Sequence, residues 1–182
     1  GMDLAEVPMD ASEVLELFTP DENGEITKCE DLPEFRSEKT REIVKILKPA
    51  CFEDLVKISA LSHGTGCWEE NGQVLVEKKQ LSIKELIGSR DDVFHYCLNL
   101  GIDRKTAFEI SEAVRKGIAS RGRNTKWSNW KKLLIQSGAE EWFIWSCEQI
   151  YYLFPKAHAV SYMIVNMKLG WFKVHYPEQF YK

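Results

Sequence analysis

Apolar residues recur every three to four positions along most of this chain, a spacing typical of helices that bury one face. The alternation in GQVLVEK, residues 72–78, is instead typical of an extended segment. We therefore predict a mainly α fold, an irregular multi-helix domain with at most a minor extended segment. The predicted helices cover residues 10–18, 37–48, 82–88, 90–100, 104–116, 125–137 and 139–152, and a last long helix opens at Pro155.

Polar residues mark the predicted helix starts. A Ser, Thr, Asp or Asn side chain at the N-cap accepts a hydrogen bond from a backbone N–H that has no partner within the helix. A Glu three residues further on completes a capping box. The predicted caps are Ser37, Ser89, Asp103 and Asn124, and the predicted capping boxes are Asp10 with Glu13 and Ser82 with Glu85.

Residues 19–36 contain TPDENGE and DLPEF, which are rich in turn-forming residues, so we predict a connector there. We divide the chain into an acidic segment of helix and connector, residues 1–50, and a helical domain, residues 51–182.

The composition is that of a soluble globular protein, with 44% apolar and 29% charged residues among 182. The longest uncharged run near the C-terminus, residues 157–167, is shorter than the roughly 20 apolar residues of a membrane span, so we expect no membrane partner. The N-terminus lacks the basic and apolar regions of a signal peptide, and we expect a cytoplasmic protein. Five scattered cysteines without C-x-x-C spacing favour reduced thiols over a disulfide framework or a zinc site.

Charge is distributed unevenly along the chain. Residues 1–112 hold 13 Lys and Arg against 24 Asp and Glu, whereas residues 113–182 hold 11 against 4, a net charge of +7. This basic part favours a polyanion partner such as a phosphate backbone. The alternative is that these charges only solvate helix faces.

Basic residues and two tryptophans alternate in VRKGIASRGRNTKWSNWKK, residues 114–132. Lys and Arg neutralise phosphates and indoles stack on exposed bases, so we predict contacts with template-primer or single-stranded DNA. Trp127 and Trp130 are spaced i and i+3, so the alternative is that they pack inward from a helix. The predicted DNA-binding residues are Lys116, Arg121, Arg123, Lys126 and Trp127.

The last helix opens with PKAHAVSY, which places Lys156 and His158 in its first turn, and Tyr162 four residues after His158 on the same face. A helix N-terminus favours anions, so Lys156, His158 and this terminus predict an anion site. On an ideal helix Lys156 points about 200° away from His158, so the two converge only if the lysine stem curls back. The alternative is a core histidine hydrogen-bonded to a neighbour.

The segment LSHGTGCW, residues 61–68, follows a predicted helix. Its glycines allow backbone N–H groups to approach a ligand, which makes Ser62, His63, Gly64 and Thr65 a candidate backbone loop. The alternative is a helix-ending turn with Trp68 packed as an anchor.

Catalytic and metal-binding motifs are not evident. The chain has no D-x-D pair and no G-x-x-x-x-G-K-[ST] loop, and His63 with Cys67 lacks two further metal ligands. Asp91 and Asp92 diverge by about 100° on a helix, and we interpret them as first-turn acids that favour the helix dipole. We predict no catalytic residue, no metal ligand and no cofactor in this chain.

Five motifs follow one another over nearly the whole chain: VPMDASEVLELF, LVKISALSHGTGCW, LIGSRDDVFHYCLNLGI, AVRKG and EEWFIWSCEQIYYLFPKAHAVSYMIVNMKLGWFKVHYP. Together they resemble the C-terminal part of the PolC-type alpha subunit of bacterial DNA polymerase III. In that family this region follows the palm and builds the fingers domain, which closes over the incoming deoxynucleotide and the templating base. The resemblance implies that residues 51–182 are fingers-like. It also implies nucleotide binding by Lys156, His158, Tyr162, Arg90 and Arg115.

The resemblance further implies what the chain lacks. The family's catalytic aspartates lie in the palm, upstream of the segment present here, and Mg2+ is expected only with those carboxylates. We therefore expect the chain alone to be inactive, with a deoxynucleoside triphosphate, template-primer DNA and the remainder of a polymerase as partners. The alternative is a stand-alone, non-catalytic helical module that binds nucleic acid or another partner. A hydrolase built on His63, His95 or His158 has no Ser/His/Asp set to support it.

Overall fold

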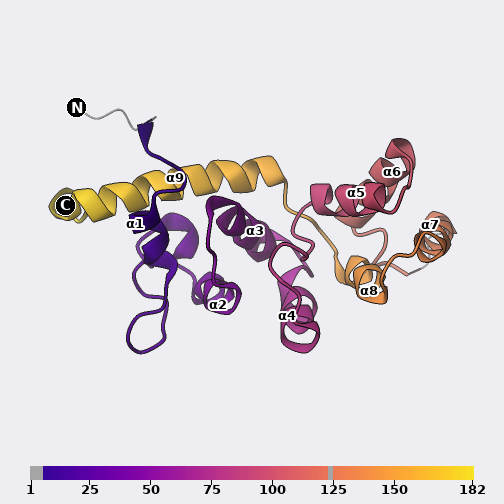
Figure 1. Ribbon diagram of the computed structural model, residues 1–182, viewed down its shortest axis with the longest axis horizontal. Helices are drawn as coiled ribbons and strands as arrows, with labels where there is room; N and C mark the ends of the chain where they lie inside the picture. Colours follow the sequence, from indigo (N-terminus) through magenta and orange to yellow (C-terminus); the bar gives the residue numbers. More distant parts are fainter. Residues whose placement is uncertain (1–5, 123–124) are drawn as a thin grey trace. The chain divides into compact units, whose positions relative to one another are not determined.

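The computed structural model describes residues 6–122 and 125–182 (Figure 1). Every regular element within those ranges is a helix, which confirms the predicted mainly α fold. The chain divides into two compact units, residues 1–59 with 157–182 and residues 60–156. The predicted division between residues 50 and 51 concerns sequence segments rather than compactness and stays a prediction. No helix in the described ranges is long and apolar enough to cross a membrane.

The first unit is built around a core in which the rings of Phe18 and Phe35 lie 4.7 Å apart. Gly170 lets the long helix α9 lie close to α1, because a Cβ atom there would lie 2.8 Å from Cγ1 of Val14. The predicted connector, residues 19–36, consists of turns, bends and one short 3-10 helix, η3. The elements of this unit are α1 (Ser12–Leu15), η2 (Glu16–Phe18), η3 (Pro33–Phe35), α2 (Glu38–Leu47), most of α3 (Phe52–His63), most of α9 (Lys156–His175) and α10 (Pro177–Phe180).

The second unit packs its aromatic residues between helices, and the Tyr96 and Phe143 rings stack at 3.6 Å. Asn71 is buried, and its amide donates to Gly66 O at 2.7 Å and accepts from Ser146 Oγ at 2.7 Å, so its polar atoms have partners. α5 and α6 lie side by side (Figure 1). The elements are η4 (Trp68–Gly72), α4 (Gln73–Lys79), α5 (Arg90–Asn99), α6 (Arg104–Arg115), α7 (Thr125–Gln136) and α8 (Glu141–Gln149).

Three predicted caps are confirmed. Ser37 accepts from Thr40 N at 3.2 Å, and Asp103 accepts from the N–H groups of Lys105 and Thr106 at 3.1 Å. Ser89 and Asp92 form a capping box at the start of α5. The predicted cap Asn124 lies outside the described residues.

The extended segment predicted at residues 72–78 is wrong. Residues 73–79 form α4, with Leu75 buried. The run QVLV, residues 73–76, fits one turn of helix as well as a strand. Hydrophobic periodicity does not distinguish helix from strand over so short a length.

Two predicted capping boxes are also wrong as helix starts. The N-cap of α1 is Ala11, with no side-chain cap, so Asp10 does not cap it. Ser82 does donate from N and Oγ to Glu85 Oε2 at 2.7 Å, but residues 83–85 form a turn. The segment before Gly88 is too short to offset the cost of helix nucleation.

The five cysteines are free thiols, and all but Cys51 are buried. Burial raises the pKa of Cys29 and of Cys97 to about 12. These side chains therefore act as small apolar residues.

Candidate phosphate-binding site

Two helices of the second unit bring basic side chains onto one carboxylate. The short loop of residues 100–103 joins α5 to α6 and makes them antiparallel neighbours. The first turn of α5 therefore lies near the last turn of α6. There Arg90 Nη1 on α5 lies 3.1 Å from Glu112 Oε1 on α6.

Glu112 also binds two cations from the end of its own helix. Arg115 donates from Nε to Oε1 at 2.9 Å and from Nη2 to Oε2 at 3.0 Å, a bidentate pair. Lys116 Nζ lies 3.4 Å from Oε2. We call Arg90, Glu112, Arg115 and Lys116 the Glu112 cluster.

The electrostatics of the Glu112 cluster favour anions. The hydrogen bonds from Arg115, followed by those from Arg90 and Lys116, lower the pKa of Glu112 to about 2 against the opposing effect of burial. The hydrogen bonds that Arg115 donates to Glu112 in turn raise the pKa of Arg115. Three cations against one carboxylate leave a net charge of +2. The Arg90 and Lys116 side chains are 41% and 56% exposed, so this charge faces solvent.

The local sequence explains how Arg90 is held. Ser89 donates from N and Oγ to Asp92 Oδ2 at 2.7 and 3.0 Å, which fixes the start of α5. The Arg90 guanidinium lies 5.4 Å from the Phe108 ring centroid, a cation–π contact across the two helices. Arg90 is therefore positioned by the capping box at the start of α5, by the Phe108 ring and by the Glu112 carboxylate.

The sequence analysis named Arg90 and Arg115 as nucleotide-binding residues and Lys116 as a DNA-binding residue, roles that stay predictions, and it did not name Glu112. The available signal was its spacing, three residues before Arg115 and four before Lys116, which places all three on one helix face. The structure brings these three predicted residues together.

The residues predicted on the last helix lie where the pattern placed them. Lys156, His158 and Tyr162 are in the first two turns of α9, and all three are exposed, Tyr162 by 41%. The exposure of His158 disfavours the alternative of a core histidine. Convergence of Lys156 with His158, and nucleotide binding by these residues, stay predictions.

The predicted DNA-binding residues of the basic segment differ in exposure. Arg121 and Lys126 are exposed, and Arg123 lies outside the described residues. Trp127 is only 4% exposed, and its Nε1 donates to Glu148 Oε1 at 3.1 Å. This burial favours the alternative of inward packing for Trp127.

The candidate backbone loop is closed by hydrogen bonds within the protein. α3 ends at His63, Gly64 N donates to Ala60 O at 2.9 Å, and Thr65 N donates to Tyr152 O at 2.9 Å. A Cβ atom on Gly64 would lie 2.4 Å from Cys67 Sγ. These contacts favour the alternative of a tightly packed helix-ending turn, and Trp68 is buried as that alternative expects.

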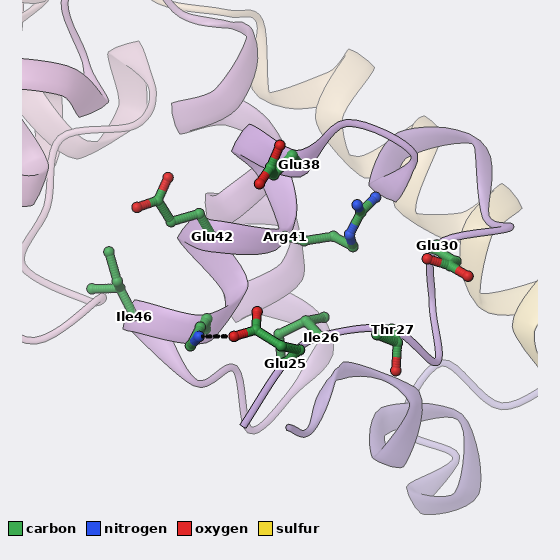
Figure 2. A pocket seen from close by; sticks show the side chains of 9 residues that line it. Glu25, Ile26, Thr27, Glu30, Glu38, Arg41, Glu42 and Ile46 are labelled. Carbon is green, nitrogen blue, oxygen red and sulfur yellow. Dashed lines mark hydrogen bonds and ion pairs between the residues drawn. The ribbon is translucent and has the colours of Figure 1, made fainter. Parts of the chain in front are cut away.

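A cavity of about 530 Å³ lies in the first unit between α2 and the connector (Figure 2). Lys45 on its wall pairs with Glu25 at 2.7 Å, and Arg41 donates to the carbonyls of Phe35 and Arg36 at 2.9 and 2.6 Å. Both cations are engaged within the unit, and carboxylates form much of the lining. The cavity therefore does not favour a phosphate. Its lining is Glu25, Ile26, Thr27, Glu30, Glu38, Arg41, Glu42, Lys45 and Ile46.

Among the residues that the structure describes, no three His, Cys, Asp or Glu side chains are grouped so that they could hold a metal ion. Asp92 is used as the partner of Ser89 in the capping box.

Residues 1–136 match the family described as the bacterial DNA polymerase III alpha subunit finger domain. Because the match covers most of the chain, the chain belongs to this family.

Relatives named DNA polymerase III PolC-type match a larger part of the chain than the family model does. These matches confirm the resemblance seen in the sequence. The protein from Caldanaerobacter subterraneus subsp. tengcongensis is 38% identical over 100% of this chain and 13% of its own length. That from Clostridium perfringens is 37% identical over 100% of this chain and 13% of its own length. That from Mycoplasma genitalium is 38% identical over 86% of this chain and 10% of its own length. The chain therefore spans only 10 to 13% of these relatives.

Proposed function

We propose that this finger domain contacts the phosphates of an incoming deoxynucleoside triphosphate and of template-primer DNA, as part of a PolC-type replicative polymerase. The observation that carries the proposal is the Glu112 cluster, in which Arg90, Arg115 and Lys116 share one carboxylate. Membership of the finger domain family supports the same function.

The chemistry of the cluster suits phosphate. A guanidinium has five N–H donors in a planar fork, and Glu112 accepts from only part of the fork of each arginine. The remaining donors and the net positive charge favour phosphate oxygens, for which arginine is well matched in geometry. Glu112 holds the two guanidinium groups in place before a ligand arrives.

Lys156, His158 and Tyr162 extend the proposal to the exposed start of α9, and Arg121 and Lys126 extend it to the basic segment. Phosphoryl transfer to a growing strand uses metal ions held by carboxylates. We propose that any Mg2+ is held by carboxylates of a palm outside this chain, and that the chain alone extends no primer.

The test is DNA binding as a function of salt. Labelled single-stranded and primed DNA should bind the chain weakly, and log K should fall linearly with log salt concentration because counterions are released. Arg115→Gln should weaken binding and reduce the slope by roughly 0.7 to 0.9 for each phosphate that the variant no longer neutralises. Lys84→Gln, at an exposed lysine of the same unit outside the cluster, is the matched control and should change neither.

The proposal fails if the parent chain binds no DNA at low salt, or if Arg115→Gln and Lys84→Gln have the same effect. A primer-extension assay with Mg2+ and deoxynucleotides accompanies the binding curves. Template-directed extension by the chain alone would contradict the proposed division of labour with the palm.

A further inference from the structure

Tyr152 presents an aromatic ring to solvent from a backbone that is held on two sides. Its N–H donates to Thr65 O at 3.2 Å, and its carbonyl accepts from Thr65 N at 2.9 Å. The next residue, Leu153, donates from N to Arg115 O at 3.2 Å. Tyr152 is nevertheless 39% exposed. The backbone from which the ring projects is therefore held in place by hydrogen bonds, while the residue itself is exposed.

Two glycines make this anchoring possible. A Cβ atom on Gly66 would lie 2.2 Å from Gln149 O, and one on Gly117 would lie 2.3 Å from Tyr151 O. The segment 149–153 thus lies in a narrow passage between the ends of α3 and α6, where a side chain on either glycine would not fit. A rigid segment loses little entropy when its aromatic ring binds a ligand.

Tyr152 lies beside the Glu112 cluster. The N–H of its neighbour Leu153 donates to the Arg115 carbonyl at 3.2 Å, and Tyr152 is among the groups that raise the pKa of Arg115. The Tyr151 ring has a different environment, because its Cδ2 atom lies 3.2 Å from where a Gly66 Cβ would be. One of the two tyrosines is therefore placed next to the cationic side chains.

We propose that the Tyr152 ring stacks on an unpaired base of single-stranded DNA whose phosphate is bound by the Glu112 cluster. This inference rests on the phosphate contact proposed above and adds a base contact to it. The charge of +2 is complementary to a phosphodiester, and an exposed aromatic ring beside such a charge offers the stacking face that single-strand binding uses. Stacking requires a π-face rather than a base-specific hydrogen bond, so the contact tolerates any base.

The experiment compares oligothymidylate with an abasic oligonucleotide of the same length and charge, by fluorescence anisotropy with the full chain. Tyr152→Leu should weaken oligothymidylate binding by roughly 5- to 100-fold and leave abasic binding unchanged. Tyr152→Phe keeps the ring and should bind like the parent. Arg115→Gln should weaken binding of both oligonucleotides. Tyr151→Leu is the matched control, since Tyr151 is 57% exposed in the same segment. This variant should bind both oligonucleotides as the parent does.

The stacking contact is overturned if Tyr152→Leu leaves oligothymidylate binding intact, or lowers binding of both oligonucleotides equally. In that case a loss of binding in Arg115→Gln still supports the phosphate contact. If the parent binds neither oligonucleotide, both proposals fall. A thermal melt of each tyrosine variant shows that the fold is retained, as expected for an exposed side chain whose backbone hydrogen bonds are unchanged.

Discussion

Gly117 lies so close to Tyr151 that a Cβ atom on the glycine would lie 2.3 Å from the Tyr151 carbonyl oxygen. The close approach ties the C-terminal end of α6, which carries Glu112 and Arg115, to the segment that carries Tyr152. The geometry of the proposed site therefore depends on Gly117, a residue that has no side chain to contact a ligand.

The first prediction tests this close approach. Gly117 and Gly101 both have positive φ, +67° and +78°, but nothing lies within 4 Å of a Cβ built on Gly101. Gly101→Ala should cost about 1 to 2 kcal/mol of unfolding free energy, for the left-handed backbone alone. Gly117→Ala should cost a further 1 to 3 kcal/mol or so, because the carbonyl must move. Thermal melts of both variants measure the difference, and equal losses would contradict the close approach.

The second prediction concerns pH. The pKa of Glu112 falls from its ordinary value of 4.5 to about 2 in the folded protein. Because the folded value is the lower one, the carboxylate stabilises the fold fully above about pH 4.5 and loses that contribution as the pH falls toward 2. Glu112→Gln should therefore be less stable than the parent at pH 7, by about 1 to 2 kcal/mol after allowance for solvent screening.

That difference should shrink as denaturant melts are repeated from pH 5 down to pH 2.5. The pH dependence that both proteins share, from all other carboxylates, cancels in the comparison. A stability difference that stays constant over this range would show that Glu112 acts by packing and not by charge.

Much of the helical fold follows from local pattern. Ser37, Ser89 and Asp103 each start a helix as their side-chain chemistry requires, because an N-cap depends on residues within one turn. The segment 72–78 was mispredicted because helix or strand is decided there by packing of Leu75, which no local pattern reveals.

The site was only partly predictable for the same reason. Arg90 and Arg115 are far apart in the sequence, and only the α5–α6 hairpin brings both to Glu112. Tyr152 was not identified, since its anchoring depends on backbone hydrogen bonds to Thr65, 87 residues earlier. Contacts between distant segments depend on the tertiary fold, which periodicity and capping rules do not describe.

The third prediction separates packing from DNA contact in the basic segment. Trp127→Phe removes the N–H that donates to Glu148 and leaves a smaller ring in a buried position. It should lower stability by about 1 to 3 kcal/mol and leave single-stranded DNA affinity within about twofold. Arg121→Glu, at an exposed position, should instead weaken binding of single-stranded DNA and leave the stability nearly unchanged. If Trp127→Phe instead weakens DNA binding without a change in melting temperature, base stacking by Trp127 is the better interpretation.

The last prediction concerns the exposed first turn of α9 and requires a full-length PolC-type polymerase that carries this region. Lys156→Ala should raise the nucleotide KM about 10- to 100-fold, because it removes a charge-assisted phosphate contact worth roughly 1.5 to 3 kcal/mol. His158→Ala should act in the same direction if the imidazole faces the triphosphate. Since both side chains are exposed, the melting temperature should change little in either variant. Lys84→Ala controls for the loss of one positive charge elsewhere. A Lys156→Ala enzyme with the parent's nucleotide titration would mean that the lysine only solvates the helix start, and a fall of several degrees in the His158→Ala melt would restore the structural role for that histidine.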